Sequence, residues 1–143
     1  MEARIAELIP RLRRYARALG NSAIPADELV RATLERASDE LRLGQATADL
    51  RVWLFGLMHE AYVRSLTGNA TPEAPAASFE QAIAALAPGQ REVFLLVTLE
   101  DMSYEEVASA LKVPVGTVMS RLSRAREKLR LGLMGQARLR AVK

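Results

Sequence analysis

The chain has 143 residues, 50% of them apolar and 26% charged, a composition typical of a globular protein with one or two small domains. It contains no cysteine, which excludes disulfides, thiolate catalysis and sulfur-ligated metal sites. No stretch approaches the roughly 20 apolar residues that span a bilayer, and no signal-peptide pattern is visible. We therefore expect a cytoplasmic protein without membrane insertion.

The net charge of +3 is distributed very unevenly along the chain. Residues 1–78 are neutral, residues 79–111 have a net charge of −5, and residues 112–143 have a net charge of +8. A strongly basic C-terminal segment indicates a polyanionic partner such as DNA, with a solvated basic tail as the alternative.

The first predicted helix runs from Ile5 to Leu19, where apolar residues recur at three- and four-residue steps. Gly20 ends it, and Pro10 within the pattern marks either its start or a kink. Several arginines of this helix are expected to be solvated: Arg11, Arg13, Arg14 and Arg17.

Two further helices are predicted in the first half of the chain. One begins with Asp27 and Glu28, acids that suit the positive end of a helix dipole, and ends near Gly44. The next has Thr47 as its expected N-cap and a sustained apolar face. That face comprises Leu50, Trp53, Leu54, Leu57, Met58, Ala61 and Tyr62. Three such helices can enclose one small core, so we expect Trp53 to lie in it rather than to bind a ligand.

Residues 67–78, TGNATPEAPAAS, have no periodicity and are interpreted as a flexible linker. A short helix is predicted from Phe79, and Pro88 suits the start of another. Residues 93–99 are almost continuously apolar and could form a buried strand. No alternating partner strand is visible, which favours a buried helix and an all-α fold of two small helical domains.

A helix-turn-helix is predicted next. Ser103 and Glu106 form a capping box that starts one helix, and Val113-Pro114 ends it. The following helix, residues 115–130, can be placed on a wheel at about 100° per residue. Its core-facing stripe comprises Val118, Leu122, Ala125 and Leu129, with Val115 at the edge.

The opposite face of this helix has small residues along its centre and cations on both sides. The centre comprises Gly116, Ser120, Ser123 and Glu127, flanked by Met119, Arg126 and Arg130 on one side and by Thr117, Arg124 and Lys128 on the other. Such a face suits a helix whose middle approaches base edges while its sides meet phosphates. The second helix is therefore the predicted DNA reader.

These residues resemble the extracytoplasmic-function (ECF) type of bacterial sigma factor, of the sigma-70 family. Residues 86–130 look like the family's sigma4-like DNA-reading domain through the LxPxQREV helix and the PVGTVxSRLSRAR turn. The first half looks like the sigma2-like polymerase-binding domain through IPRLRRYARAL, ADELVRATLERA and VWLFGLMHEAY. The implied division is a sigma2-like domain at 1–66, the linker at 67–78, a sigma4-like domain at 79–133 and a basic tail at 134–143.

The resemblance implies a promoter-specificity subunit, monomeric when free, that binds core RNA polymerase, promoter DNA and an anti-sigma factor. The implied contacts to the −35 element are Thr117, Met119, Ser120, Arg121, Ser123, Arg124, Arg126 and Lys128. The implied contacts to the polymerase β′ clamp are Asp27, Glu28 and Arg31, and those that open the −10 element are Trp53, Glu60 and Arg64. The wheel puts Arg121 near the core edge, where it either reaches a phosphate or pairs with an acid of the second domain.

Departures from the family's usual pattern leave an alternative function open. Arg31 stands where the clamp-binding helix commonly has glutamine, and Glu60 where the promoter-opening helix commonly has asparagine. The basic end of that helix is reduced to Arg64. A carboxylate repels a nucleic-acid strand. A sigma-like adaptor or decoy that binds an anti-sigma factor, and a DNA-binding regulator that dimerises through its first half, are therefore further hypotheses.

The sequence gives little support for catalysis or metal binding. His59 is the sole histidine, which excludes a His-centred metal cluster, and we expect it to be solvated. Glu105 and Glu106 are explained by helix capping, and no phosphate-cradling glycine motif is present. We therefore predict no enzymatic activity, no catalytic residue and no cofactor.

Overall fold

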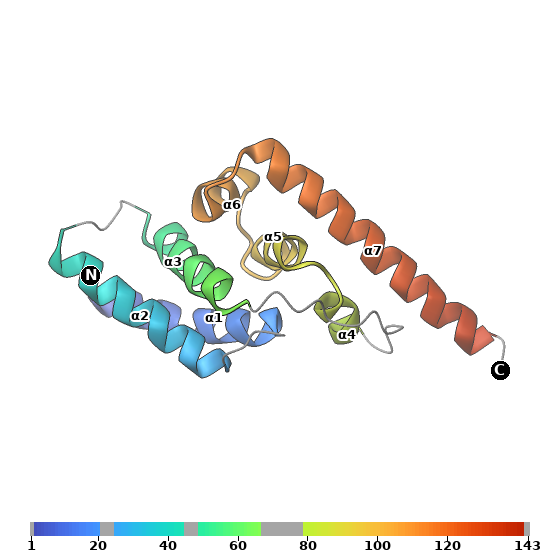
Figure 1. Cartoon of the computed structure of the whole chain (residues 1–143), viewed down its shortest axis with the longest axis horizontal. Coiled ribbons are helices and arrows are strands. Elements are labelled where there is room, and N and C mark those ends of the chain that lie inside the picture. The colour runs from blue at the N-terminus through green and yellow to red at the C-terminus, as the bar shows by residue number, and fades with distance from the viewer. Residues whose placement is uncertain (1, 21–24, 45–48, 67–78, 142–143) are drawn as a thin grey trace.

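The computed structural model describes residues 2–20, 25–44, 49–66 and 79–141. These residues form seven helices and no strand, which confirms the all-α prediction (Figure 1). The helices are α1 (Glu2–Leu19), α2 (Ala26–Arg42), α3 (Leu50–Ser65), α4 (Phe79–Ala84), α5 (Pro88–Thr98), α6 (Tyr104–Leu111) and α7 (Val115–Ala141). The predicted linker at 67–78 lies outside the described residues.

The helices of the first half end where the sequence predicts. Gly20 and Gly44 adopt positive φ angles of 49° and 72° just after α1 and α2, a conformation that favours glycine. Pro10 lies inside α1, so it does not start that helix.

The N-cap of α3 is Asp49, whose carboxylate accepts a hydrogen bond from the Val52 amide at 3.1 Å. The prediction of Thr47 as this cap is wrong, because Asp49 is the residue placed to receive that amide.

In the second half of the chain, α5 and α6 begin where the proline and the capping box predict. Pro88 begins α5, and residues 93–98 are helical rather than extended. The predicted capping box is present, because Ser103 Oγ accepts from the Glu106 amide and the Glu106 carboxylate accepts from the Ser103 amide. Lys112 takes a left-handed conformation in the turn before α7. α7 extends to Ala141, beyond the predicted end at residue 130, and includes most of the predicted tail at 134–143.

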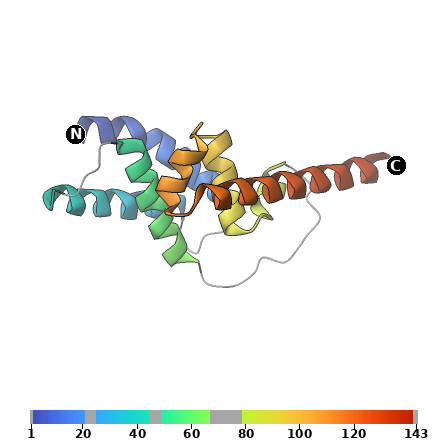
Figure 2. The same ribbon diagram turned by 90° about the horizontal axis from the view of Figure 1, so that it is seen from above.

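The two helical units pack against each other and share one core. Buried residues from Leu12 on α1 to Leu129 on α7 form a single cluster. α3 packs against both α2 and α6, while α1 packs against α5 (Figures 1 and 2). α3 is therefore buried on more sides than one apolar face predicts, and Phe55, outside that face, is 1% exposed and meets the Tyr15 ring edge-on at 5.1 Å.

Candidate nucleic-acid interface

The helix-turn-helix presents the predicted reader face of α7 to solvent. The capped start of α6 and the left-handed Lys112 set the direction in which α7 leaves the turn. The predicted core stripe is confirmed, because all four of its members are buried: Val118, Leu122, Ala125 and Leu129. As a result Ser120 and Ser123 are exposed, and so is 53% of Met119. Figure 1 shows α7 along the outer side of the second unit.

The cations of this face mostly lack acidic partners. In the part of the chain that the structure describes, Arg124, Arg126 and Lys128 are exposed and form no ion pair. Glu127 pairs with Arg130 at 2.6 Å, and this hydrogen bond and charge hold the pKa of Glu127 below its usual value. A groove of about 380 Å³ lies between Tyr104 at the start of α6 and the exposed side of α7. The face is therefore positively charged, open and partly hollowed.

Arg121 is separated from the other predicted DNA contacts. Its guanidinium lies over Gly89 at the start of α5, where a Cβ atom would come within 3.3 Å of it. Burial raises the pKa of Glu92 on α5, and the charges of nearby groups, including Arg121, oppose that rise. The structure therefore places Arg121 against α5, where its charge acts on Glu92 without an ion pair between the two side chains in the described structure.

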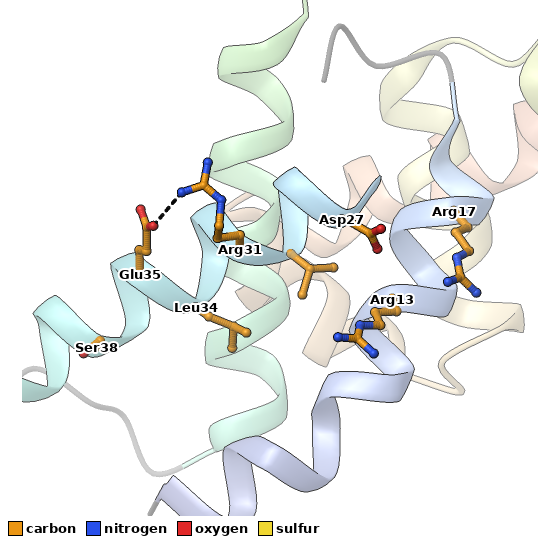
Figure 3. Close-up of a pocket in the computed structure, with 8 residues that line it drawn as sticks. Arg13, Arg17, Asp27, Arg31, Leu34, Glu35 and Ser38 are labelled. Atoms are coloured by element: carbon orange, nitrogen blue, oxygen red, sulfur yellow. Dashed lines mark hydrogen bonds and ion pairs between the residues drawn. The ribbon is translucent and has the colours of Figure 1, made fainter. Parts of the chain in front are cut away.

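The predicted polymerase contacts lie together on the exposed side of α2. Asp27, Glu28 and Arg31 occupy its first turns, and Arg31 pairs with Glu35 at 2.8 Å (Figure 3). A groove of about 580 Å³ is lined by Asp27 and Arg31 on α2 and by the exposed Arg13 and Arg17 on α1. This pair of arginines is solvent-accessible, as the sequence predicts.

The three residues predicted to open the −10 element do not form one free surface. Trp53 is 8% exposed and its Nε1 donates to Glu40 at 2.9 Å, so its assignment to the core is confirmed. Glu60 forms an ion pair with Lys112 Nζ at 3.0 Å, and this pair connects α3 to the end of α6. Arg64 is exposed and donates to the Glu60 carbonyl.

The polar contacts between the units centre on Glu100, whose side chain is fully buried. We use the term seam for the surface where α1 and α3 meet α5, α6 and the residues between them. Glu100 accepts from Arg11 Nε at 3.0 Å and Arg14 Nη2 at 3.3 Å, while its carbonyl accepts from Arg11 and Arg51. The prediction that these arginines are solvated holds for Arg14, which stays exposed although it contacts this acid. It is wrong for Arg11, whose partly buried side chain donates to the Glu100 carboxylate.

Two more polar contacts cross the seam, and the first of them is an ion pair. Arg51 Nη2 lies 2.7 Å from Glu106, and His59 Nδ1 lies 2.5 Å from Glu92. Hydrogen bonds from Ser103 and then Arg51 hold the pKa of Glu106 below its usual value. The prediction that His59 is solvated is wrong, because its ring contacts the buried Glu92 carboxylate and is itself only 22% exposed. Three of the six acids of residues 79–111 thus find partners in the first unit: Glu92, Glu100 and Glu106.

Arg91 is a buried link between the units and is 2% exposed. Its acceptors are the carbonyls of Leu19, Gly20, Ile83, Ala84 and Leu86 and the hydroxyl of Tyr62, at 2.6–3.4 Å. Carbonyls at helix ends carry partial negative charge, which compensates a buried guanidinium. Arg91 is the arginine of the LxPxQREV motif, whose spacing alone does not reveal this role.

Comparison with known proteins identifies both units. Residues 76–129 match the family described as Sigma-70, region 4, and residues 5–59 match the Sigma2 domain of PhyR. The ECF RNA polymerase sigma factor EcfG of Rhodopseudomonas palustris (strain TIE-1) is 31% identical over 141 residues, covering 85% of this chain and 78% of that protein. The ECF sigma factor SigC of Mycobacterium tuberculosis is 34% identical over 125 residues, or 73% of this chain and 68% of that one.

A third relative and a solved structure extend the comparison. The phyllosphere-induced regulator PhyR of Methylorubrum extorquens is 33% identical over 129 residues, covering 87% of this chain and 47% of PhyR. The sigma factor RpoE of Bartonella quintana, solved with the anti-sigma factor NepR, superposes with a TM-score of 0.75 at 25% identity, covering 93% of this chain and 96% of RpoE. No described helix is long and apolar enough to cross a membrane. The chain belongs to the family of ECF RNA polymerase sigma factors.

Proposed function

We propose that this chain directs core RNA polymerase to promoters and reads the −35 element with the outer face of α7. The observation that carries the proposal is the set of exposed cations on that face, Arg124, Arg126 and Lys128, which have no acidic partner in the described structure. Unpaired cations along one helix are the electrostatic footprint of a phosphate backbone.

The centre of the face suits contact with base edges. Ser120 and Ser123 are small and exposed, so the helix axis can approach the floor of a major groove. The exposed Met119 offers an apolar surface of the kind that meets a thymine methyl group. The cations on either side of this centre would then lie next to the two phosphate backbones that border the groove. Arg121 is not counted as a DNA contact in this proposal, because its half-buried guanidinium lies over Gly89 of α5.

The sigma2-like unit supplies the docking surface for polymerase. Asp27, Glu28 and Arg31 share the exposed side of α2, and the match of residues 5–59 to a sigma2 domain supports this assignment. An anti-sigma factor is the expected regulator, because the related RpoE was solved in complex with one. We expect the free chain to be a monomer.

Two assays test the proposal. In run-off transcription, core polymerase with this chain should initiate from templates that carry a matched −35 element. Binding to a library of −35 duplexes should shift in base preference for Ser120→Ala, while the control Ser38→Ala on exposed α2 should not change it. Failure to initiate at any promoter of the organism would contradict the proposal.

A second candidate function is an adaptor that captures an anti-sigma factor. It is favoured by the ion pair of Glu60 with Lys112 and by the 33% identity to PhyR, a protein whose Bartonella quintana counterpart is described as an anti-anti-sigma factor. Co-purification separates the two. The adaptor retrieves a small inhibitor and little core polymerase, whereas the sigma factor retrieves core polymerase.

A further inference from the structure

One polar contact of the seam joins two side chains that can both change their protonation state. His59 Nδ1 on α3 lies 2.5 Å from Glu92 Oε2 on α5. The side chain of Glu92 is 2% exposed and that of His59 is 22% exposed. Because α3 and α5 belong to different units, each of these groups would meet water in place of the other if the units separated. The contact is therefore made only while the seam is closed.

The ion pairs that the structure describes across the seam do not share this property. Each of them joins a carboxylate to an arginine or a lysine: Glu100 with Arg11 and Arg14, Glu106 with Arg51, and Glu60 with Lys112. Arginine and lysine remain protonated near neutral pH, so these pairs keep their charges there. The contact of His59 with Glu92 is the one in the described seam that a change of pH near neutrality can alter.

The groups that act on Glu92 come from four helices. The hydrogen bond and charge of His59 on α3, and the charges of Arg121 on α7 and Arg91 on α5 itself, favour its carboxylate form. Its own charge acts in turn on two buried hydroxyls, those of Tyr15 on α1 and Tyr62 on α3. Among the described residues, His59 is the basic group that contacts Glu92 directly.

Burial makes the closed seam hold a proton more tightly than the separated units do. A carboxylate loses more hydration than a carboxylic acid when it leaves water, so burial favours the protonated form. Burial accordingly raises the pKa of Glu92 and outweighs the opposing hydrogen bond and charge of His59. In separated units the same carboxyl group would titrate near its ordinary value of 4.5. The chain therefore takes up a proton on closing at pH values above that point.

We propose that the contact of His59 with Glu92 makes the seam a pH-sensitive switch, in which a proton held between these two side chains keeps the units closed and its loss at higher pH favours their separation. The sign follows from linkage, because a state that binds a proton more tightly is populated less as the pH rises. The ratio of separated to closed chains should rise by up to about tenfold per pH unit, from pH 4.5 until the raised pKa of Glu92 is passed.

The switch is a property of the free chain and goes beyond the proposed function. It bears on that function because the α2 surface and the outer face of α7 lie on different units, so the closed seam fixes the separation between them. Loss of the proton releases that constraint. Failure of the switch and failure of the proposed function are distinguishable, because the switch is measured without polymerase or DNA.

The distance between the units reports the switch directly. Because the chain lacks cysteine, donor and acceptor dyes can be attached at Ser38→Cys on α2 and Ala85→Cys after α4, at two exposed positions. Energy transfer is followed from about pH 5 to about pH 8, and circular dichroism at each pH confirms that the helices remain. We expect the transfer efficiency of the wild type to fall as the pH rises.

Two variants distinguish the switch from a general effect of charge. Glu92→Gln has a side chain of the same size that can still hydrogen-bond to His59 but cannot titrate, so its energy transfer should not change with pH. The matched control is Glu105→Gln, which removes an exposed carboxylate from the first turn of α6. It should keep the response of the wild type.

The titration of Glu92 itself gives a second measurement. Its carboxyl carbon resonance in NMR is identified by its absence from Glu92→Gln, and in the wild type it should titrate above pH 4.5. A Cβ atom on Gly56 of α3 would lie 3.0 Å from the Ala110 carbonyl of α6, so Gly56→Leu forces these helices apart. Lys112→Glu opens the seam independently by placing two carboxylates together at Glu60. In both variants the midpoint of Glu92 should return to near 4.5.

Either of two results would overturn the proposal. Energy transfer that stays constant with pH in the wild type, or that falls equally in Glu92→Gln, would show that loss of this proton does not open the seam. A midpoint of Glu92 that is the same in the wild type and in both opened variants would show that closure takes up no proton there.

Discussion

Arginines cluster on two surfaces of this chain, the outer face of α7 and the seam, and the two differ in what faces them. At the seam, Arg11, Arg14 and Arg51 meet Glu100 and Glu106. On α7, Arg124 and Arg126 have no acid partner in the described structure. The same residue type thus joins helices in one place and remains available for an external polyanion in the other. Basic composition alone does not separate these roles.

The largest effect is expected inside the seam at Arg91. Arg91→Leu removes the buried donor to the Leu19 and Leu86 carbonyls and to the Tyr62 hydroxyl. At about 1 kcal/mol or more for each of these groups, the free energy of unfolding should fall by at least about 3 kcal/mol. Urea unfolding measures this loss. For comparison, Arg42→Leu at the exposed pair with Asp39 should cost under about 1 kcal/mol, and equal losses would refute the assignment.

A smaller loss is expected at Glu100. Glu100→Gln removes the buried charge that Arg11 and Arg14 share, and we expect a loss of about 2 kcal/mol, since both arginines can still reach water. Thermal unfolding at neutral pH measures it. Glu35→Gln, which breaks the exposed pair with Arg31, is the matched control and should change stability by less than half as much.

The pH dependence of stability reports on Glu92. Burial raises the pKa of Glu92 in the folded chain, so the folded state holds this proton at pH values where the unfolded chain has released it. The free energy of unfolding should therefore fall as pH rises from the unfolded value of 4.5 through the raised one, by about 1.4 kcal/mol per unit of pKa rise.

The variant Glu92→Gln has no carboxyl group to titrate there, so its free energy of unfolding should lack this pH-dependent contribution. The difference in unfolding free energy between variant and wild type should then shift in favour of the variant across that window. A difference that stays constant with pH would indicate that Glu92 keeps an ordinary pKa.

Most of the local structure could be predicted from the sequence because its signals are local. The Ser103–Glu106 spacing set the start of α6, and the 3.6-residue periodicity identified the buried stripe from Val118 to Leu129. Periodicity does not distinguish a helix from a strand over residues 93–99, and the lack of a partner strand in the sequence favours the helix that α5 forms there. The end of α7 was missed because residues 131–141 include good helix formers, and Gly132 and Gly135 do not end the helix.

The seam could not be predicted in this way because it joins residues far apart in the chain. Arg11 and Glu100 are separated by 89 positions, and nothing near Arg11 marks it as different from Arg13. His59 was misjudged for the same reason, since its partner Glu92 belongs to the other unit. The net charge of −5 over residues 79–111 is the one available signal, because half of the acids in that segment contact basic side chains of the first unit.

The central claim is that the cations of α7, and not those of the seam, bind duplex phosphates. The most direct test compares the salt dependence of −35 duplex binding for the wild type, Arg124→Ala and Arg14→Ala. We predict that Arg124→Ala weakens binding evenly across sequences and lowers the slope by about 1, whereas Arg14→Ala leaves it unchanged. An unchanged slope for Arg124→Ala, or an equal fall for Arg14→Ala, would contradict this account.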